Sequence, residues 1–235
     1  MTLPVPYYQD SAVTLYHGDC RAIVPMLDRG LVVTDPPYNI GYHYESYADN
    51  LDPEDYNEML RAVCPEPCVL IHYAEDIVAL SWILESVPEK MVAWVYPSNT
   101  ARQWRSIAWF GCKPDFNKDG QDYKNPKDKR IAERIARGER ARLYDWWEIN
   151  QVKNVSNEKT GHPCQIPLSV MERIIRITES PLVIDPFAGS GTTLLAAKNL
   201  GRRAIGVEMD ERYCEIIAAR ISSAAKPAMA ELQLA

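Results

Sequence analysis

Residues 35–38, Asp35-Pro36-Pro37-Tyr38, combine groups that could bind and orient an aromatic amine. They follow Leu31-Val32-Val33-Thr34, whose apolar and β-branched content predicts a buried strand. The two prolines fix φ and lack N–H donors, so we expect rigid carbonyls that are free to accept hydrogen bonds. Asp35 adds a carboxylate, and Tyr38 adds a flat ring for stacking. Such a turn could hold an exocyclic amine by its hydrogens, although an ordinary proline turn is the alternative.

A second motif, Asp185-Pro186-Phe187-Ala188-Gly189-Ser190-Gly191-Thr192-Thr193, follows the predicted strand 182–185 and precedes a predicted helix that ends near Gly201. The glycines permit close approach of a ligand to the backbone, and a helix N-terminus favours an anionic group. Glu208 ends the next predicted strand, 23 residues after Asp185, where a carboxylate can accept two hydrogen bonds from a ribose diol. This arrangement predicts a nucleoside site, and a dinucleotide stays an alternative. Because no Gly-Lys-Ser/Thr follows the loop, a nucleoside-triphosphate site is disfavoured.

A fourth acidic residue, Asp19, comes just after the predicted strand 12–16, in His17-Gly18-Asp19-Cys20. Its carboxylate could accept a hydrogen bond from an adenine amino group. It could also cap the predicted helix 21–27, which is the more common use of an aspartate at this position.

Strands and helices alternate along most of the chain, which predicts an α/β fold with a mainly parallel sheet covered on both faces. Further predicted strands are 69–73, 91–96, 104–110 and 204–208. Further predicted helices begin after Asp52 and Asp210 as N-caps, and span 75–85 and 168–178.

Three stretches depart from this alternation. Residues 39–50 are rich in Tyr and Gly and predict a mobile loop over a pocket. Residues 111–142 predict an inserted, partly irregular subdomain, after which Tyr144, Trp146 and Trp147 mark a return to the core. Residues 222–235 are Ala-rich and predict a frayed end.

The length of 235 residues fits one large domain with a small insertion. No apolar run is long enough to cross a bilayer, and the first residues have no signal-peptide character. The six cysteines are scattered, which favours free thiols in a reducing cytosol. Cys64 and Cys68 have no matching second pair, so we expect no metal site. These features favour a cytoplasmic protein without a membrane partner.

The charge is uneven along the chain. The net charge is -6, yet residues 101–142 hold 12 Lys and Arg against 6 Asp and Glu, which leaves -12 on the remainder. A basic segment on an acidic body is typical of a phosphate-binding surface, with a solvated, salt-bridged helix as the alternative.

Together, residues 34–39 and 185–193 resemble the amino-methyltransferases of DNA, which transfer a methyl group from S-adenosyl-L-methionine to adenine N6 or cytosine N4. The similarity extends over most of the chain, through residues 17–19, 160–167 and 201–213. The catalytic motif precedes the cofactor motif with a variable segment between them. This resembles the circularly permuted order of the β group of the family.

The resemblance implies a seven-stranded, mainly parallel, Rossmann-like S-adenosylmethionine-dependent methyltransferase fold, circularly permuted. The strand ending at Asp185 would be central, and the strands ending at Glu208, Asp19 and Asp35 would be the next three across. Residues 1–110 would form the catalytic half of one domain, residues 111–150 an inserted basic target-recognition region, and residues 151–235 the cofactor-binding half.

The resemblance also implies roles for single residues. Asp35, Pro36, Pro37 and Tyr38 would receive the target base. Glu208 would bind the cofactor's ribose, and Asp19 with Cys20 its adenine. The other residues implied at the cofactor are Asp185, Phe187, Gly189, Ser190, Gly191 and Thr192. The family often has Thr and Lys where this chain has Cys164 and Ile166, so a lysine contact with the cofactor's carboxylate is not expected here.

The implied activity is methylation of the N6 amine of a flipped-out adenine in a specific sequence of double-stranded DNA, in a prokaryote or phage. Adenine is favoured because the Asp form of the turn is commoner in adenine enzymes. N4-cytosine methylation is the alternative, followed by methylation of RNA or of a protein amide, and by a catalytically silent nucleic-acid-binding module. A homodimer and a partner restriction endonuclease are both compatible with the sequence.

Pro163-Cys164-Gln165 is similar to the nucleophile motif of cytosine-C5 methyltransferases, in which a thiolate attacks the ring. Its order relative to the glycine loop is wrong for that class, and no Glu-Asn-Val segment accompanies it. The Asp35 turn would also have no purpose. We therefore expect no covalent role for Cys164.

Overall fold

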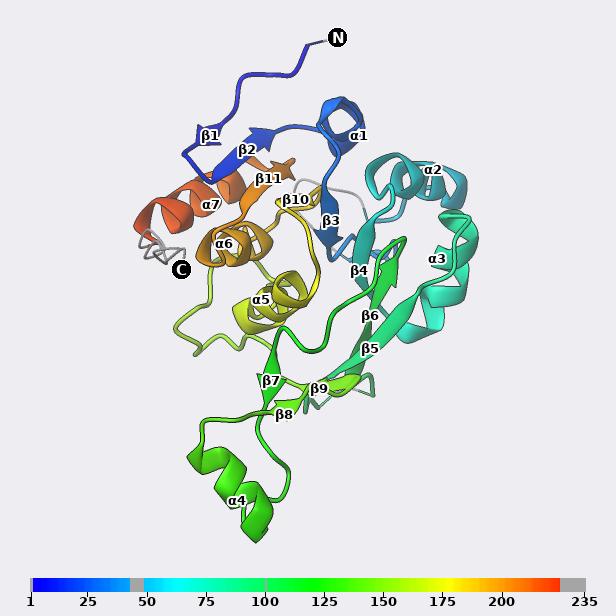
Figure 1. Ribbon diagram of the computed structural model, residues 1–235. Coiled ribbons are helices and arrows are strands. Elements are labelled where there is room, and N and C mark those ends of the chain that lie inside the picture. Colours follow the sequence, from blue (N-terminus) through cyan, green and yellow to red (C-terminus); the bar gives the residue numbers. More distant parts are fainter. Residues whose placement is uncertain (1, 43–48, 100, 225–235) are drawn as a thin grey trace.

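The computed structural model describes residues 2–42, 49–99 and 101–224, and it is organised around one nine-stranded sheet (Figure 1). The strands, in order across the sheet, are β1 (Tyr8–Gln9), β2 (Val13–His17), β11 (Arg203–Glu208), β10 (Leu182–Asp185), β3 (Leu31–Thr34), β4 (Cys68–His72), β6 (Trp104–Phe110), β5 (Lys90–Val95) and β9 (Trp146–Glu148). The strands from β2 to β4 are all parallel, and β6 runs antiparallel to β4 and β5. The expected α/β fold with a mainly parallel sheet is confirmed, and short edge strands β1 and β9 extend the seven expected strands.

The position of β3 differs from the expectation. We expected the strand before Asp35 to lie third from β10, beyond β11 and β2, and this was wrong. β3 lies on the other side of β10 and pairs with it directly, with Val183 opposite Leu31 and Ile184 opposite Val32. All four residues of β3 are buried, which suits a central strand with neighbours at both edges and helices on both faces. The loops after β3 and β10 are therefore adjacent.

Two apolar clusters cover the two faces of the sheet, because successive strand residues point to opposite sides. Leu31 and Val33 pack with α5 (Leu168–Ile177), α6 (Thr192–Asn199) and α7 (Glu211–Ser223). Val32 packs on the opposite face with α1 (Cys20–Ile23), α2 (Pro53–Val63) and α3 (Ile77–Ile83). The helix predicted over residues 21–27 is α1 followed by the 3-10 turn η1 (Val24–Met26), and the one over residues 75–85 is η2 (Ala74–Asp76) followed by α3.

The predicted N-caps are confirmed. Asp52 accepts a hydrogen bond from the Glu54 N–H at the start of α2, and Asp210 accepts one from the Arg212 N–H at the start of α7. Each carboxylate thereby pairs a backbone donor that the helix itself cannot satisfy.

Part of the predicted insertion projects from the main body (Figure 1). It consists of α4 (Lys129–Ala136) and the two-stranded pair β7 (Gly120–Gln121) and β8 (Ala141–Arg142). No residue of α4 is buried. The predicted return to the core is confirmed, because β9 pairs with β5 and Trp147 is buried. The chain thus rejoins the sheet before residue 150.

The loop predicted over residues 39–50 is only partly described. Asp49 is buried and accepts hydrogen bonds from the N–H groups of Asn39 and Tyr42, which closes the base of this loop. Residues 43–48 and the predicted Ala-rich end from residue 225 lie outside the described residues. Among the described helices, none has the length and apolarity to span a membrane.

Candidate active site

A cavity of about 460 Å³ opens at the carboxyl ends of β2, β11, β10 and β3. All but one of the predicted site residues line it: Asp19, Cys20, Asp35, Pro36, Pro37, Tyr38, Asp185, Phe187, Gly189, Ser190, Thr192 and Glu208. Open α/β sheets bind ligands at this edge, where the chain switches direction across the sheet. Here the switch lies between β10 and β3, so the glycine loop and the proline turn face one shared space.

The glycine loop after β10 needs two residues without a Cβ. Gly189 has φ +52°, and an added Cβ would lie 3.0 Å from Nε2 of His162. Gly191 has φ +73° and is the N-cap of α6; it does not line the cavity, and an added Cβ would lie 2.9 Å from the Ile217 side chain. The missing Cβ of Gly189 therefore makes room for the His162 ring, whereas that of Gly191 makes room for α7 to pack.

Asp185 ties the two loops together. Its Oδ1 accepts hydrogen bonds from the Thr34 hydroxyl at 2.6 Å and from the Phe187 N–H at 3.1 Å. Burial raises the pKa of Asp185 to about 6. The carboxylate thus joins the end of β3 to the glycine loop, which fixes the relative position of the two motifs.

Glu208 lies where β11 ends, and both of its oxygens accept backbone hydrogen bonds. Oε2 accepts from the Gly189 N–H at 2.7 Å, and Oε1 accepts from the Asp210 N–H at 2.9 Å. Burial raises the pKa of Glu208 to about 7, although these backbone donors oppose the shift. Each oxygen keeps a further lone pair that could accept from a ligand hydroxyl.

Asp19 caps α1, as the more common use of such a residue predicts. Its Oδ1 accepts from the Arg21 N–H at 2.9 Å, and the Arg21 guanidinium bonds both carboxylate oxygens. Burial raises the pKa of the neighbouring Cys20 to about 12, so this thiol is neutral. Both residues line the cavity beside β2.

The turn after β3 is held by hydrogen bonds from two tyrosines. The Tyr38 hydroxyl donates to Oδ1 of Asp35 at 2.5 Å. The Tyr56 hydroxyl donates to the Pro37 carbonyl at 2.8 Å. The expectation that both proline carbonyls would be free acceptors was therefore wrong for Pro37, which α2 uses to anchor the turn.

One face of the Tyr38 ring is covered. The His72 ring packs on it with the centroids 4.0 Å apart and the planes inclined by 32°. The Tyr73 ring meets Tyr38 in an edge-to-face contact, with the centroids 4.7 Å apart. The face that packs against His72 is therefore not available for stacking with a ligand.

Arg105 also lines this cavity, and it was not among the predicted site residues. Its Nη1 lies 3.2 Å from Oδ2 of Asp35, and the exposed fractions of the two side chains are only 14% and 15%. Burial raises the pKa of Asp35, while Arg105 and the Tyr38 hydroxyl oppose that rise. We had counted Arg105 in the basic segment, whereas its place within the apolar strand 104–110 was the signal of a buried charge.

His162 and Cys164 line the side of the cavity near the glycine loop. Nδ1 of His162 accepts from the Cys164 N–H at 3.3 Å, and the imidazole meets the Tyr213 ring edge-to-face with the centroids 4.6 Å apart. Burial lowers the pKa of His162 to about 4, so this ring is neutral. It packs against Gly189 as an uncharged wall.

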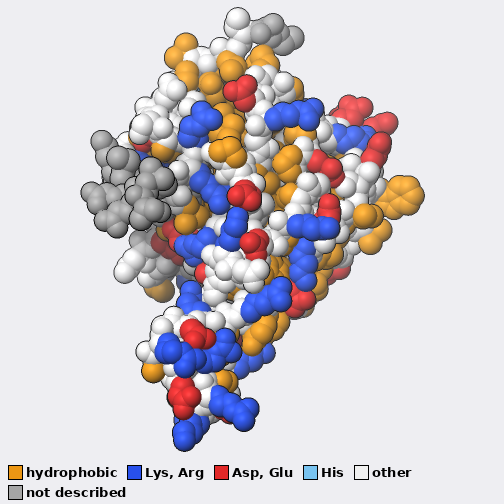
Figure 2. All heavy atoms as spheres, viewed as in Figure 1, with side chains coloured by type: hydrophobic (Ala, Val, Ile, Leu, Met, Phe, Trp, Pro, Cys, Tyr) orange, Lys and Arg blue, Asp and Glu red, His pale blue; other side chains and the backbone are white. Residues whose placement is uncertain are grey.

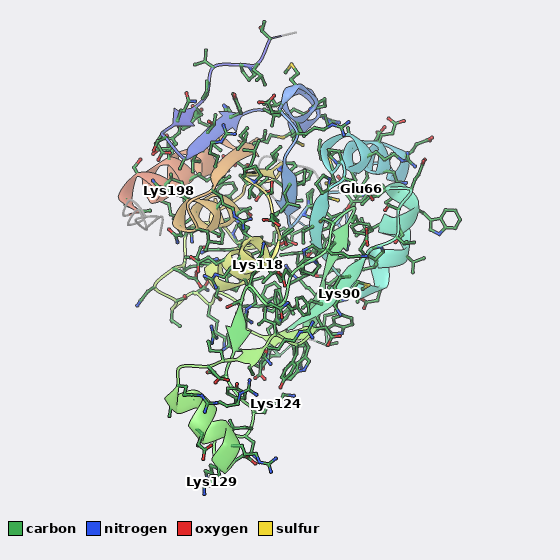
Figure 3. All side chains as sticks on the ribbon, in the orientation of Figure 1. Glu66, Lys90, Lys118, Lys124, Lys129 and Lys198 are labelled. Carbon is green, nitrogen blue, oxygen red and sulfur yellow. The ribbon has the colours of Figure 1, made fainter. Side chains whose placement is uncertain are left out.

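The basic segment divides into paired and unpaired cations. Lys113 pairs with Glu89, and Lys118 with Glu179, on the main body. Side chains of both charges gather over the projecting part in Figure 2, and Figure 3 places Lys124 and Lys129 there. Within the described ranges, no carboxylate lies within 4 Å of four cations of this part: Lys124, Lys127, Lys129 and Arg130.

Comparison with known proteins gives consistent matches. A family model described as DNA methylase matches residues 72–219. The type II methyltransferase M.ScaI of Streptomyces caespitosus is 28% identical over 94% of this chain and 85% of its own. The DNA adenine methyltransferase YhdJ of Escherichia coli K12 is 25% identical over 96% of this chain and 88% of its own.

Solved structures show the same fold. The complex of M1.HpyAVI with SAM superposes with a TM-score of 0.57 at 25% identity, covering 89% of this chain and 98% of its own. The cytosine-N4-specific PvuII DNA methyltransferase superposes with a TM-score of 0.63 at 19% identity, covering 95% and 90%. The motif resemblance described above is thus confirmed at the level of the family, while the permuted motif order stays a prediction.

Proposed function

This chain belongs to the DNA methylase family, and from that premise we propose that it transfers a methyl group from S-adenosylmethionine to the N6 amine of an adenine in double-stranded DNA. One observation carries the proposal. The proline turn after β3 and the glycine loop after β10 end neighbouring parallel strands and line one cavity. An amine held at the first motif would therefore lie beside a nucleoside held at the second.

The residues present fit S-adenosylmethionine. The cavity volume of about 460 Å³ lies in the usual range for small-molecule sites, about 300–1,000 Å³. Gly189 lines the cavity, Glu208 can accept from the ribose hydroxyls, and Asp19 lies at the next strand end for the adenine. When bound, this cofactor supplies an electrophilic methyl group on a sulfonium sulfur.

The chain's own residues would hold and orient the target base. A flipped-out base costs roughly a few kcal/mol of unstacking, and stacking on an aromatic ring returns about 1–3 kcal/mol. The Tyr38 ring, which lines the cavity, would provide that stacking. Asp35 and the Pro36 carbonyl would accept the two amine hydrogens, which orients the lone pair of the nitrogen. Their negative charge and dipole stabilise the positive charge that develops on the nitrogen.

Adenine is favoured over cytosine by the Asp form of the turn and by the name of YhdJ, a DNA adenine methyltransferase that aligns over nearly the whole chain. N4-cytosine methylation is the second candidate, because both amines present the same two hydrogens to Asp35. The PvuII methyltransferase, which has the same fold, is named as cytosine-N4-specific. At 19% identity, this likeness concerns only the fold.

The test is methylation of unmodified DNA with isotope-labelled S-adenosylmethionine, followed by nucleoside analysis and modification-sensitive sequencing. We expect N6-methyladenine at one short sequence. N4-methylcytosine would replace the first candidate by the second. Label in RNA or protein but not in DNA would contradict both, and so would an inactive protein that still binds cofactor and DNA.

Residues 111–150, with the projecting α4, are proposed as the target-recognition region, flanked by the two halves of the methyltransferase domain. The relatives named as type II methyltransferases support a role beside a restriction endonuclease. DNA modified by this enzyme is then expected to resist an endonuclease that cuts the same sequence.

Cys164 lines the cavity, so a covalent mechanism that uses its thiolate can be tested by substitution. The transfer proposed here needs no nucleophile from the protein, so Cys164→Ser should retain nearly full activity. Loss of transfer in Cys164→Ser, together with label at cytosine C5 in DNA treated with the wild type, would favour the thiolate mechanism instead.

A further inference from the structure

Arg105 reaches the proline turn from an unexpected direction. β6 is separated from β3 by β4, so the guanidinium extends past the end of β4 to meet Oδ2 of Asp35 at 3.2 Å. The Asp35 carboxylate therefore accepts hydrogen bonds from two sides, because the Tyr38 hydroxyl donates to Oδ1 from within the turn.

Aromatic rings enclose the Arg105 guanidinium. Its central carbon lies 5.4 Å from the centroid of the Tyr38 ring, 5.8 Å from that of Tyr73 and 5.7 Å from that of Trp94. Nε of Arg105 is buried and has no hydrogen-bond partner among the described residues. Asp35 is the carboxylate that compensates this charge, and the rings limit the directions in which the guanidinium can move.

Two of the acceptor positions of the Asp35 carboxylate are occupied, and this determines where a further hydrogen bond can form. A carboxylate has about four acceptor positions, two on each oxygen. Tyr38 takes one on Oδ1, and Arg105 takes one on Oδ2. One acceptor position on each oxygen stays available, and the carboxylate cannot rotate without breaking both bonds.

We propose that Arg105 is a positioning residue for methyl transfer: it holds the Asp35 carboxylate ionised and fixes the direction in which that carboxylate accepts an amine hydrogen. This inference rests on the proposed function and adds a residue to it. A protonated Asp35 would carry its own hydrogen on one oxygen, and that hydrogen would compete with the hydrogens of the amine. Arg105 acts on the reaction only through Asp35.

The surrounding charges support this role. Burial raises the pKa of Asp35, and Arg105 provides the largest opposing effect, followed by the Tyr38 hydroxyl. The other titratable groups near this carboxylate cannot replace a cation: Asp185 on β10 is acidic, Tyr73 and Tyr96 are phenols, and burial lowers the pKa of His72 to about 4. Without Arg105, the pKa of Asp35 rises further.

The primary test compares Arg105→Gln and Arg105→Lys with the wild type in kcat against pH, using DNA and S-adenosylmethionine. For Arg105→Gln, we expect the acidic limb of kcat to move up by about one pH unit or more, with a roughly tenfold loss near that limb and recovery at high pH. KM for DNA should change much less than kcat. Arg105→Lys should restore most of the wild-type profile, because it keeps the charge.

Arg102→Gln is the matched control. Arg102 lies beside the same strand and packs over the Tyr73 ring at 4.1 Å, but its ion pair is with Glu75. This variant removes the same charge from the same region without touching Asp35. It should leave the pH dependence of kcat unchanged.

A second measurement does not depend on the activity. The ¹³C resonance of the Asp35 side-chain carboxyl, assigned by its absence in Asp35→Asn, reports the ionisation of this group in the free protein. A higher pKa in Arg105→Gln than in Arg105→Lys or the wild type would support the proposal, even if the enzyme proved to methylate another substrate. An unchanged Asp35 titration would overturn it.

Three kinetic outcomes would also overturn the proposal. If KM for DNA rises by the same factor as kcat falls, Arg105 would be a phosphate contact. Faster turnover of Arg105→Gln would make the ion pair an inhibitory contact. A loss that is uniform across pH and equal in Arg105→Lys would make the residue structural. If Arg105→Gln does not fold, the Asp35 titration is measured in Arg105→Met instead. A raised Asp35 pKa in that variant would support the role, and an unchanged pKa would overturn it.

Discussion

At the scale of single residues, Asp35 and Arg105 depend on one another for stability. Breaking a buried ion pair from one side leaves an uncompensated charge, which costs about 3–5 kcal/mol in comparable sites. Asp35→Ala should therefore abolish turnover and also lower the free energy of unfolding by about 3 kcal/mol. Chemical denaturation measures the change in the free energy of unfolding. Under conditions in which the variant is folded, its affinity for the cofactor should stay nearly intact.

A double-mutant cycle separates this pair from its surroundings. Asp35→Asn and Arg105→Gln remove one charge each, and the double variant removes both while keeping similar shapes. Because residues in contact couple, the double variant should be destabilised by about 1–3 kcal/mol less than the sum of the single variants. Strictly additive losses would mean that the 3.2 Å contact contributes nothing to stability.

Glu208 makes cofactor affinity depend on pH. Burial raises its pKa to about 7, so the carboxyl is protonated below that pH and ionised above it. Ribose hydroxyls need the ionised form as acceptor, so the affinity for S-adenosylhomocysteine should rise with pH up to about 7 and then level off. Below that pH, the loss should approach tenfold per unit if only the ionised form binds.

The matched control for this pH effect is Glu208→Gln, which cannot ionise in this range. We expect weaker binding of S-adenosylhomocysteine whose pH dependence is largely removed, as measured by calorimetry from pH 5.5 to 8.5. A dependence that survives in Glu208→Gln would assign the titration to another group, and Asp185, with its pKa of about 6, is the nearest candidate.

Sequence reasoning was strongest for acids at strand ends and weakest for Arg105. Asp35, Asp185 and Glu208 follow β-branched runs, and a strand places the residue after it at the edge of the sheet. Arg105 could not be assigned in this way, because its partner lies 70 residues earlier in the chain. Its role appears only when β6 is placed next to β4.

At the scale of elements, the turn between β10 and α6 makes a prediction about Gly189. Gly189→Ala must adopt a left-handed φ and also move the His162 ring, which lies 3.0 Å from the added Cβ. The ring and the Gly189 N–H bond to Glu208 both border the cofactor side of the cavity. We expect cofactor affinity to fall roughly tenfold or more, since about 1.4 kcal/mol of strain is sufficient.

Gly138→Ala is the control for Gly189. Gly138 has φ +76° after α4, but nothing lies within 4 Å of an added Cβ. It should lower the free energy of unfolding by about 1–2 kcal/mol through backbone strain alone. Cofactor affinity should be unchanged, as measured by calorimetry, and an equal loss in both variants would remove the special role of Gly189.

The types of the elements could be predicted from the sequence, but their order across the sheet could not. Asp52 and Asp210 begin helices as expected, because capping is a local interaction. The expected position of β3, third from β10, was wrong, because a buried β-branched run does not reveal which strands it will pair with; β3 pairs directly with β10. This error matters functionally, since adjacency of these two strands is what joins the two motifs.

At the scale of the whole molecule, charge is separated between the main body and the projecting part. A net charge of -6 repels DNA in general, so any phosphate contacts must come from local cations. The basic segment, residues 101–142, was predicted to provide them, with a solvated, salt-bridged helix as the alternative. The structure leaves fewer cations of this segment free for DNA. Arg105 pairs with Asp35 at the candidate site, and Lys113 and Lys118 pair with carboxylates on the main body.

The projecting part should therefore set the salt dependence of DNA binding. Lys127 and Lys129 lie at the start of α4, and among the described residues no carboxylate pairs with them. If both contact phosphates, Lys127→Gln/Lys129→Gln should reduce the slope of log affinity against log salt by about 2, since each lost contact removes about 0.9. Fluorescence anisotropy with labelled duplex DNA at several salt concentrations measures this slope.

The control double variant, Lys113→Gln/Lys118→Gln, makes the same change in net charge. These lysines already pair with Glu89 and Glu179, so their loss should change the slope by much less than one. Cofactor affinity should be the same in both double variants, because none of the four lysines lines the cavity. Equal slopes in the two variants would mean that DNA responds to the total charge of the protein and not to the projection, and residues 111–150 would then lose their proposed role in target recognition.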